Sequence, residues 1–539
     1  MRCPSCGKEY SDEYKFCLDC GTALVNEPKA EPKVEYKYAP EEAPQPQQAT
    51  VKKNVPKTII VAALTVIAVI VAVTVISNVL SSGSDFAFKT TIMKAFYIPD
   101  EEVVGLAKNG VNTGVSIDST LSGGSSMYGN VYVVPVFSDN TLNVYANDQL
   151  KTIEDFSGYK ISSDGSKIAV LNADGELNLY DTSTWKKERV ATDASDLGLT
   201  ISPDGASLTY TVYDDDEYKA YVYKNGSSET IGKRLIPFGI GNSAKYIYCF
   251  HSENGGVYVV DEKGNSTKLS GDAGTYYIFN KDRSQMIFTT NDSIYVTVRG
   301  GEKIKISGKD NSISLSAPEG AATEFNYYSI FFQSGLHASI YTYTYGVSNL
   351  AEKFYITGSN KLIYLDKEWN VTTVASGLSS VTGAISREGK TLCYVKNDRL
   401  YKVDSKDPTN SISIADDVIS AKVASDGKSI YYVDDSETLW YKNGDKDAKR
   451  IADDVDSMVM TYDDYLLFLA DYSYSSYSGI LYSSKNGGEK SKISDDAYNL
   501  SVDGNIAYYM SEYSKSDSTG GLYAAQAKDK FELVENGVR

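Results

Sequence analysis

Histidine is almost absent from this chain of 539 residues, which contains only His251 and His337. Two histidines leave little room for a His-based metal centre or for a nucleophile that a histidine activates. The chain also lacks a G-x-S-x-G nucleophile elbow and a Walker loop. The sequence therefore nominates no catalytic residue and no cofactor-binding residue, and both histidines are interpreted as surface or packing residues.

Cysteine is also scarce, with six residues in the chain, but four of them fall within the first twenty positions. They form two C-x-x-C pairs, Cys3 with Cys6 and Cys17 with Cys20. Two such pairs bring four thiolates toward one tetrahedral metal ion, for which zinc is the usual occupant. Four cysteine ligands leave no position for water, so the sequence predicts a structural zinc site.

This N-terminal segment, residues 1–25, resembles the short zinc ribbons found at the N-termini of many bacterial membrane proteins. The resemblance rests on the four cysteines and on Gly7 and Gly21, which follow the two pairs. So short a segment cannot bury enough apolar surface to fold unaided, so metal binding would supply most of its folding free energy. The resemblance implies a structural or partner-binding module and no reaction. An accidental cluster or a redox C-x-x-C is the alternative.

Long apolar runs without a charge are absent with one exception, the 23 residues 58–80. As a helix this run would be about 34 Å long, enough to cross a bilayer. It follows residues 26–57, where prolines interleaved with Glu and Lys predict a disordered linker. A buried soluble helix and a cleaved signal peptide are the alternatives, and the length and position of the run disfavour both.

Basic residues flank only one end of the predicted membrane span. Lys52, Lys53 and Lys57 precede it, whereas residues 81–85 read Ser-Ser-Gly-Ser-Asp. The positive-inside rule then places the N-terminus in the cytoplasm and the C-terminal domain outside the cell membrane. Residues 1–57 hold nine basic and nine acidic side chains, so the net charge of −18 lies on the external part. Such an acidic domain is not expected to bind nucleic acid.

A short turn signature recurs through the external part. Five Asp-Gly or Glu-Gly dipeptides, usually after a serine, carry this signature, and their acidic residues are Asp164, Asp204, Glu388, Asp426 and Asp503. The spacings are 40 and 38 residues and, over two units, 77 residues. Asn-Gly dipeptides, the strongest short hairpin signal, fall about half a period later. Each period of roughly 40 residues therefore predicts four antiparallel strands.

Four-stranded units of this size, repeated around an axis, make a β-propeller. The S-x-D-G turn followed by an apolar strand resembles the repeats of TolB-type and oligopeptidase-type propellers, and the resemblance touches much of residues 120–515. It implies a mainly β extracytoplasmic domain over residues 90–539, with seven or eight blades. A sandwich of two sheets is the runner-up fold. The period breaks between residues 300 and 350, where an insertion or a degenerate blade is expected.

Acidic residues of the external part have two interpretations. Residues 214–217 form an acidic run that could supply oxygen ligands to calcium, although a solvated hairpin tip explains them as well. Asp164, Asp204 and Asp426 occupy turn positions, where a short carboxylate caps the local backbone, so a structural role is predicted. The two remaining cysteines, Cys249 and Cys393, lie in apolar strand-like segments and are interpreted as buried free thiols rather than a disulfide.

Tyrosine is abundant, with 44 residues. Tyr341, Tyr343 and Tyr345 alternate with threonine, so in a strand their rings share one face. Tyr472, Tyr474 and Tyr477 form a looser cluster. Exposed rings could stack on the sugar rings of a cell-wall polymer, whereas buried rings would fill the space between blades, which is the preferred interpretation.

Two functional classes remain. In the first, the protein is a single-pass, membrane-anchored, non-enzymatic binding, sensing or scaffold protein. Its propeller engages a protein or glycan of the cell envelope, while the ribbon meets a cytoplasmic partner. In the second, the propeller is a cell-surface glycoside hydrolase that uses a carboxylate pair about 5 to 9 Å apart. The first is favoured because the sequence nominates no such pair.

Overall fold

The computed structural model describes residues 85–89, 91–118, 126–331, 337–378, 383–526 and 530–539. All of them belong to one compact unit, Thr74–Arg539. The predicted zinc ribbon, linker and membrane span lie outside the described residues. Within the described ranges, no helix is long and apolar enough to cross a membrane.

The described unit is built almost entirely from short antiparallel strands, with one 3-10 helix, Asn242–Ala244. In its first half, consecutive strands form sheets β1–β3, β4–β7, β8–β11, β12–β15 and β16–β19. Their bounds are, in order, Met93–Ile98, Val103–Lys108, Val111–Asp118; Ser126–Tyr128, Val131–Val136, Thr141–Ala146, Gln149–Ile153; Gly158–Ile161, Lys167–Leu171, Leu177–Asp181, Lys187–Ala191; Ser195–Ile201, Ser207–Asp214, Glu217–Lys224, Ser227–Lys233; Leu235–Ile240, Tyr246–His251, Val257–Asp261, Ser266–Ser270.

The second half repeats this arrangement with two variations. Strand β24 pairs with β27 rather than with β25, and β41 is shared by two consecutive ladders, β38–β41 and β41–β44. The bounds of β20–β29 are Tyr276–Phe279, Gln285–Thr289, Ser293–Val298, Ile304–Gly308, Ile313–Leu315, Thr323–Phe331, His337–Tyr345, Lys353–Thr357, Lys361–Leu365 and Val371–Ser376.

The remaining strands form sheets β30–β33 and β34–β37 and the two ladders that share β41. The bounds of β30–β37 are Gly383–Ile385, Thr391–Lys396, Arg399–Asp404, Asp407–Ala415, Val418–Val423, Ser429–Asp434, Leu439–Asn443 and Lys449–Ala452. Those of β38–β44 are Val455–Met460, Leu466–Ser473, Ser478–Ser484, Ser491–Asp503, Ile506–Ser514, Thr519–Gln526 and Lys530–Val538.

Apolar side chains hold each sheet against the next one along the chain. The buried residues form eleven clusters, and each cluster lies between two neighbouring sheets or ladders. One cluster packs Ile168 of sheet β8–β11 on Val144 of sheet β4–β7, for example. Burial of apolar surface between successive sheets is therefore what stabilises this unit.

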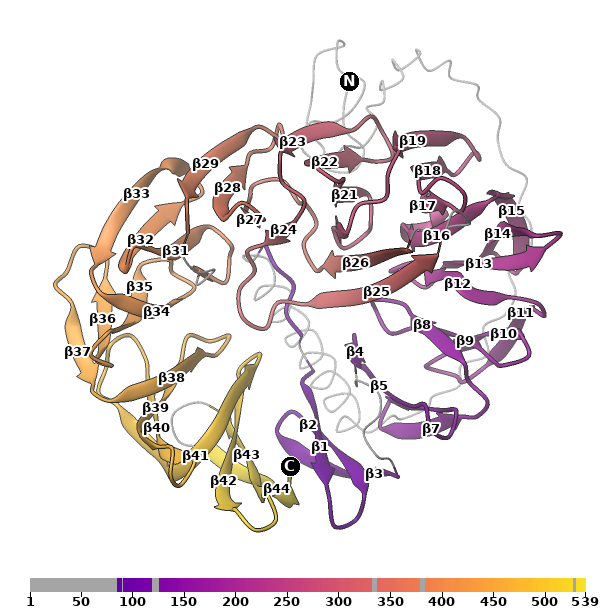
Figure 1. Cartoon of the computed structure of the whole chain (residues 1–539). Helices are drawn as coiled ribbons and strands as arrows, with labels where there is room; N and C mark the ends of the chain where they lie inside the picture. The colour runs from indigo at the N-terminus through magenta and orange to yellow at the C-terminus, as the bar shows by residue number, and fades with distance from the viewer. Residues whose placement is uncertain (1–84, 90, 119–125, 332–336, 379–382, 527–529) are drawn as a thin grey trace, which may run out of the picture. The chain divides into compact units, whose positions relative to one another are not determined.

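The succession of packed sheets leads back to sheet β1–β3. One cluster joins this sheet to β4–β7, and another joins it to ladder β41–β44. The C-terminal Arg539 donates its backbone N–H to the carbonyl of Tyr97 at 2.9 Å, and Asn112 donates to Glu535 at 2.7 Å. The first and last sheets consequently lie side by side, and the sheets follow one another around a common centre (Figure 1).

This arrangement confirms a mainly β fold that resembles a propeller. The described residues form ten hydrogen-bonded sheets, one of which contains two ladders, and the expectation of seven or eight blades stays a prediction. Several of these sheets, such as β16–β19, lack the Asp-Gly turn on which that expectation rested. The break in the period is explained as well, because β25 and β26 form a hairpin inserted between β24 and β27. Strand β26 pairs in parallel with β20 and so extends that sheet.

Six turns between the first and second strands of a sheet share one geometry. In each, the backbone N–H of the fourth residue donates to the carbonyl of the first over 2.7–3.0 Å. The fourth residue has a φ between 55 and 74°. We name these the repeat turns; they are residues 162–165, 202–205, 280–283, 386–389, 424–427 and 461–464.

The acidic side chain at the third position holds the repeat turn together. Asp204 accepts hydrogen bonds from Ser202 Oγ at 2.6 Å and from the N–H of Ala206 at 3.2 Å. Asp164 makes the equivalent contacts, at 2.6 and 2.9 Å. Asp426 accepts from the N–H groups of Lys428 and Ser429, both at 2.8 Å. The predicted structural role of these three aspartates is confirmed.

Candidate functional site

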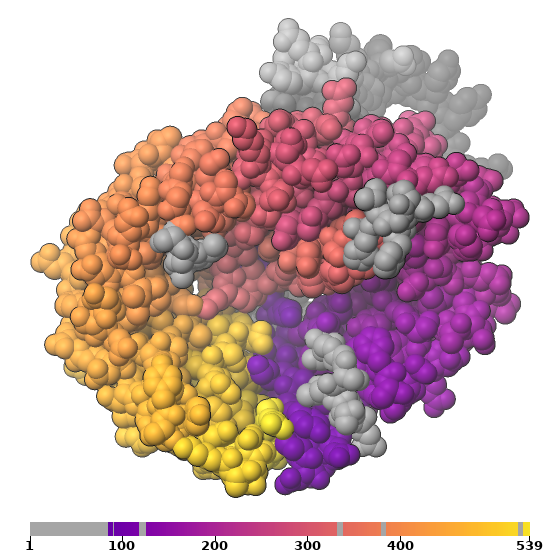
Figure 2. Space-filling model, in the orientation of Figure 1, coloured from indigo at the N-terminus to yellow at the C-terminus, as the bar shows by residue number. Residues whose placement is uncertain are grey.

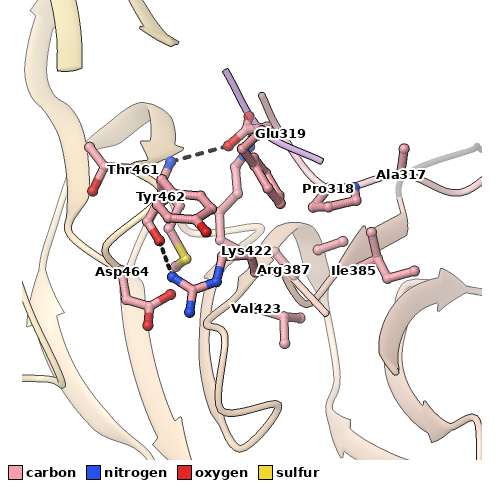
Figure 3. A pocket seen from close by; sticks show the side chains of 14 residues that line it. Ala317, Pro318, Glu319, Ile385, Arg387, Lys422, Val423, Thr461, Tyr462 and Asp464 are labelled. Atoms are coloured by element: carbon pink, nitrogen blue, oxygen red, sulfur yellow. Dashed lines mark hydrogen bonds and ion pairs between the residues drawn. The ribbon is translucent and has the colours of Figure 1, made fainter. Parts of the chain in front are cut away.

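One pocket, of about 120 Å³, lies where the inner strands of three neighbouring sheets meet the segments around Phe88 and Pro318 (Figure 3). We call it the Glu319 pocket. Arg387 and Tyr462, the second residues of two repeat turns, both line it. Ile385 lies at the end of β30, and Lys422 and Val423 at the end of β34. The pocket is thus assembled by first strands and their turns.

The two carboxylates of the Glu319 pocket are both held by neighbouring groups. Glu319 forms an ion pair with Lys422 and accepts a hydrogen bond from the N–H of Met460 at 3.2 Å (Figure 3). Asp464 accepts from the N–H of Ser425 at 2.8 Å and from its hydroxyl. Each carboxylate therefore has a structural partner, and Asp464 ties one repeat turn to the next.

Aromatic and cationic groups form the other side of the pocket. The Phe88 and Tyr462 rings lie 4.5 Å apart between centroids. The guanidinium of Arg387 lies 4.4 Å from the Tyr462 ring and donates to the Tyr462 carbonyl at 2.8 Å (Figure 3). Cation–π contact and hydrogen bond together fix the orientation of this arginine. The Glu319 pocket is therefore lined by both positive and negative side chains, and aromatic rings form one of its walls.

A second candidate lies on hairpin β25–β26, where aromatic rings gather on one face. Phe325 and Tyr343 have ring centroids 4.9 Å apart, and Tyr327 and Tyr341 5.3 Å apart. Tyr276 of β20 extends the row, 5.4 Å from Tyr341. We call these five residues the aromatic face. They share a face because side chains alternate along each strand and the ladder pairs Phe325 with Tyr343 and Tyr327 with Tyr341.

The aromatic face is exposed to solvent to an unusual degree. Phe325 and Tyr327 are 49% and 50% exposed, respectively. The hydroxyl of Tyr327 lies within hydrogen-bond distance of Ser329, at 3.1 Å, and of Ser339, at 2.9 Å, so the ring is held in place. Part of the hairpin lies at the surface of the face drawn in Figure 2. The predicted tyrosine row, Tyr341, Tyr343 and Tyr345, is itself half-buried, and the exposed rings of the aromatic face are Phe325 and Tyr327.

The third tyrosine of the predicted row is different. Tyr345 lies beside Tyr343, with ring centroids 6.4 Å apart, and packs against the buried cluster that contains Tyr355. Burial raises the pKa of Tyr345 to about 12. Tyr341, Tyr343 and Tyr345 therefore share a face as predicted, and the first two belong to the aromatic face.

The looser tyrosine cluster lies at the tip of hairpin β39–β40. Tyr474 and Tyr477 are 74% and 52% exposed. The Tyr472 and Tyr474 rings are 5.1 Å apart, and the Tyr474 hydroxyl donates to Asp456 at 3.0 Å. Tyr477 instead contacts Tyr513 of the adjacent hairpin, at 5.9 Å. These rings are more dispersed than those of the aromatic face.

The acidic run 214–217 lies at the tip of hairpin β13–β14. Lys219 pairs with Asp214 at 2.6 Å, and Lys233 pairs with Glu217 at 2.5 Å. No group of three or more potential metal ligands occurs among the described residues. The contacts fit the hairpin-tip interpretation of this run.

The two remaining cysteines, Cys249 and Cys393, are buried free thiols, as predicted. Burial raises the pKa of both, that of Cys393 to about 12, so neither thiol is activated. The four predicted zinc ligands, Cys3, Cys6, Cys17 and Cys20, lie outside the described residues.

Sequence reasoning missed two repeat turns because their fourth residue is not glycine. Arg283 and Asp464 occupy that position with φ of 55° and 67°. Both turns retain an aspartate at the third position, Asp282 and Asp463. A hydrogen-bonding side chain at the first position followed two residues later by aspartate would have found them.

Comparison with known proteins identifies a zinc-ribbon domain at residues 2–24. Comparison with curated proteins gave no significant match. Among solved structures, TolB from Acinetobacter baumannii is similar at 15% identity and a TM-score of 0.26, with 43% of this chain and 68% of that chain covered. A eukaryotic initiation factor is similar at 11% identity and a TM-score of 0.38, over 83% of this chain and 97% of that chain.

The tricorn protease is a third similar structure, at 11% identity and a TM-score of 0.26, over 83% of this chain and 63% of that chain. Similarities this low carry no argument about function. The propeller-like architecture rests on the packing of this chain's own sheets, and the N-terminal zinc ribbon on its family match.

Proposed function

We propose that the protein is a membrane-anchored receptor that binds a polysaccharide of the cell envelope through the aromatic face. The observation that carries this proposal is the half-exposed pair Phe325 and Tyr327 on an inserted hairpin, backed by three more rings. Large apolar side chains gathered on a soluble surface usually mark a binding site. A row of rings on one face of a hairpin suits a repeating ligand with flat apolar faces.

Sugar rings meet that description, because their axial C–H groups form apolar patches between polar hydroxyls. Stacking on Phe325, Tyr327 and Tyr341 would use those patches. Nearby hydroxyls can accept or donate hydrogen bonds to the sugar, and Ser329 and Ser339 already flank Tyr327. Tyrosine itself combines an apolar ring with a polar tip, which suits an interface that is partly wet.

For the N-terminal part of the chain we propose a zinc ribbon and a single membrane span. Cys3, Cys6, Cys17 and Cys20 would hold one structural zinc ion, in a ribbon that meets a cytoplasmic partner. Residues 58–80 would cross the membrane once, with Lys52, Lys53 and Lys57 on the cytoplasmic side. The domain of packed sheets would then lie outside and present the aromatic face to the envelope.

A glycan-active enzyme is the second candidate, and the Glu319 pocket is the observation that favours it, because it contains Glu319 and Asp464. A glycosidase needs one carboxyl to donate a proton and another to act as base or nucleophile. Here Lys422 and Ser425 engage the two groups. We therefore favour binding, since hydrolysis would require both carboxylates to leave their partners.

Co-sedimentation of the full-length chain with insoluble cell-wall polysaccharide tests the proposal. Phe325→Ala and Tyr327→Ala together should weaken binding about tenfold or more, as loss of two aromatic contacts of ~0.5–1.5 kcal/mol each implies. Tyr213→Ala is the matched control, because Tyr213 is 58% exposed on a different hairpin. Equal binding by the double variant and the control would contradict the proposed site.

The same samples distinguish binding from hydrolysis. Release of reducing sugar ends should stay at background for the wild-type chain. If sugar ends appear and Glu319→Gln or Asp464→Asn abolishes them without a change in melting temperature, the enzyme is the correct alternative.

Membrane topology has its own test. Protease added to intact cells stripped of their wall should digest the external domain and spare the N-terminal ribbon. Cleavage of the ribbon under these conditions would reverse the proposed orientation.

A further inference from the structure

A cavity of about 200 Å³, distinct from the aromatic face, has largely apolar walls. We call it the Lys281 pocket. Phe88, Met127, Tyr128 and Tyr345 supply its apolar walls. Phe88 also lines the Glu319 pocket, so this one side chain borders both. Concave, largely apolar sites with a few polar groups are the usual sites for small molecules.

The repeat turns place particular residues in the two pockets. Ser163 and Lys281 are second residues of their turns and line the Lys281 pocket, as Arg387 and Tyr462 line the Glu319 pocket. The first, third and fourth positions are committed to the hydrogen bonds and the positive φ of the turn. In these four turns the second position is therefore free to vary in chemistry while its residue lines a pocket.

The charges available in the Lys281 pocket are positive. Lys281 lies in an exposed turn and Lys89 is half-buried, and neither forms an ion pair or side-chain hydrogen bond with another residue in the part of the chain that the structure describes. The carboxylate in the pocket, Glu324, is already paired with Arg283 at 3.2 Å and accepts from Ser163 at 2.8 Å. Two unpaired ammonium groups thus stand beside apolar walls in a chain of net charge −18.

The geometry points to a binding site for a small organic anion with an apolar body, such as a carboxylate. The carboxylate would accept charge-assisted hydrogen bonds from Lys281 and Lys89, and the body would contact Phe88 and Met127. The ammonium group of Lys281 would select a negatively charged ligand. Lys281 occupies the second position of its turn, where the residue type can vary without disturbing the turn. This site is independent of polysaccharide binding, since none of its lining residues belongs to the aromatic face.

Isothermal titration of the full-length chain with benzoate, phenylacetate and hexanoate, each compared with its primary amide, tests this site. At least one carboxylate should bind about tenfold more tightly than its amide, as one charge-assisted hydrogen bond implies. Lys281→Met should remove most of that difference, and Lys89→Met should reduce it. Lys305→Met, which changes an exposed lysine on β23, should leave it unchanged.

Three results would overturn the inference. They are the absence of binding by all three carboxylates, equal affinity for each carboxylate and its amide, and an undiminished preference for the carboxylate in both Lys281→Met and Lys89→Met. Because Lys281 is exposed, its variant should keep the wild-type melting temperature, which the same samples verify. Tyr327→Ala should keep full affinity for the carboxylate, so failure of the polysaccharide proposal and failure of this one are distinguishable.

Discussion

Arg283 and Glu324 form a buried ion pair, with Nη2 and Oε2 3.2 Å apart and side chains only 5% and 13% exposed. Arg283 also donates from Nη1 to the carbonyl of Ile201 at 2.8 Å. One guanidinium therefore connects a repeat turn, the inserted hairpin and the end of β12. It holds in position the hairpin that presents the aromatic face and borders the Lys281 pocket.

Loss of Arg283 should be strongly destabilising. Arg283→Ala would leave Glu324 as an unpaired, largely buried charge, which typically costs about 3–5 kcal/mol. The double variant Arg283→Met with Glu324→Met should lose less than Arg283→Ala alone, because apolar side chains remove both charges together. Urea unfolding gives the free energies of unfolding of the wild type and of both variants.

An exposed ion pair of similar geometry provides the control. Arg234 and Glu253 lie 3.2 Å apart, but their side chains are 49% and 40% exposed. Arg234→Ala should change the free energy of unfolding by only about 0–1 kcal/mol. Equal losses for Arg234→Ala and Arg283→Ala would show that burial does not determine the strength of the Arg283–Glu324 contact.

The aspartates of the repeat turns should make the free energy of unfolding fall at low pH. Burial raises the pKa of Asp204, but hydrogen bonds from Ser202, Ala206 and Ser243 outweigh it and hold the pKa below its ordinary value. The pKa of Asp426 is likewise lowered, because backbone and hydroxyl hydrogen bonds from Ser429 and the N–H of Lys428 outweigh burial. A lowered pKa in the folded state contributes stability above the unfolded pKa of about 3.9, and this is lost as pH falls through the folded pKa.

The measurement is the urea midpoint at several pH values between about 5 and about 2.5. The wild-type midpoint should fall steadily over this range. Asp204→Ala should start lower, by about 0.5–2 kcal/mol in free energy of unfolding, and fall less steeply. An Asp204→Ala curve parallel to the wild type would show that Asp204 does not titrate with folding.

The repeating turns and strands of this fold could be predicted from the sequence. The Asp-Gly turns around Asp164, Asp204 and Asp426 could be recognised because only glycine adopts their positive φ without strain, which makes the signature regular. The alternation of Tyr341, Tyr343 and Tyr345 correctly predicted a shared face, since side chains in any strand alternate with period two.

The sequence was not sufficient where long-range contacts override local patterns. Arg283 adopts a glycine-like φ, and its guanidinium is fixed by carbonyl and carboxylate groups far away in sequence. Exposure of Phe325 and Tyr327 depends on which face of an inserted hairpin packs on the sheet, and the pattern of alternation is the same for either face. Some sheets, such as β16–β19, lack the Asp-Gly turn signature, so the period of that signature does not locate them.

The next prediction concerns zinc binding by the four N-terminal cysteines. The full-length chain should carry about one equivalent of zinc, because four thiolates complete a tetrahedral shell. Cys17→Ser should lose the metal, since three remaining thiolates bind it less tightly and the ribbon folds only with metal. Cys393→Ser, which changes a buried free thiol far in sequence from the four N-terminal cysteines, is the control and should keep the metal. A chain with disulfides between these cysteines and no zinc would rule out the ribbon site.

Substitutions at Gly389 and Phe86 test whether the segment that precedes β1 packs against a repeat turn. Phe86 is 3% exposed, and a Cβ at position 389 would lie 2.6 Å from its ring, at a φ of +72°. Gly389→Ala combines a clash with an unfavourable φ and should cost about 2–4 kcal/mol. Gly377→Ala, at a φ of +67° with nothing within 4 Å of the new Cβ, isolates the φ effect and should cost about 1 kcal/mol.

Combining Gly389→Ala with Phe86→Ala separates the two contributions. Phe86→Ala alone should cost about 3–5 kcal/mol, because it leaves a cavity in a buried cluster. In that background Gly389→Ala should cost only about as much as Gly377→Ala, since the ring that it would strike is gone. Free energies of unfolding from urea titration give the coupling directly. If the effects of Gly389→Ala and Phe86→Ala simply add, the segment from Asp85 to Lys89 does not pack against this repeat turn in solution.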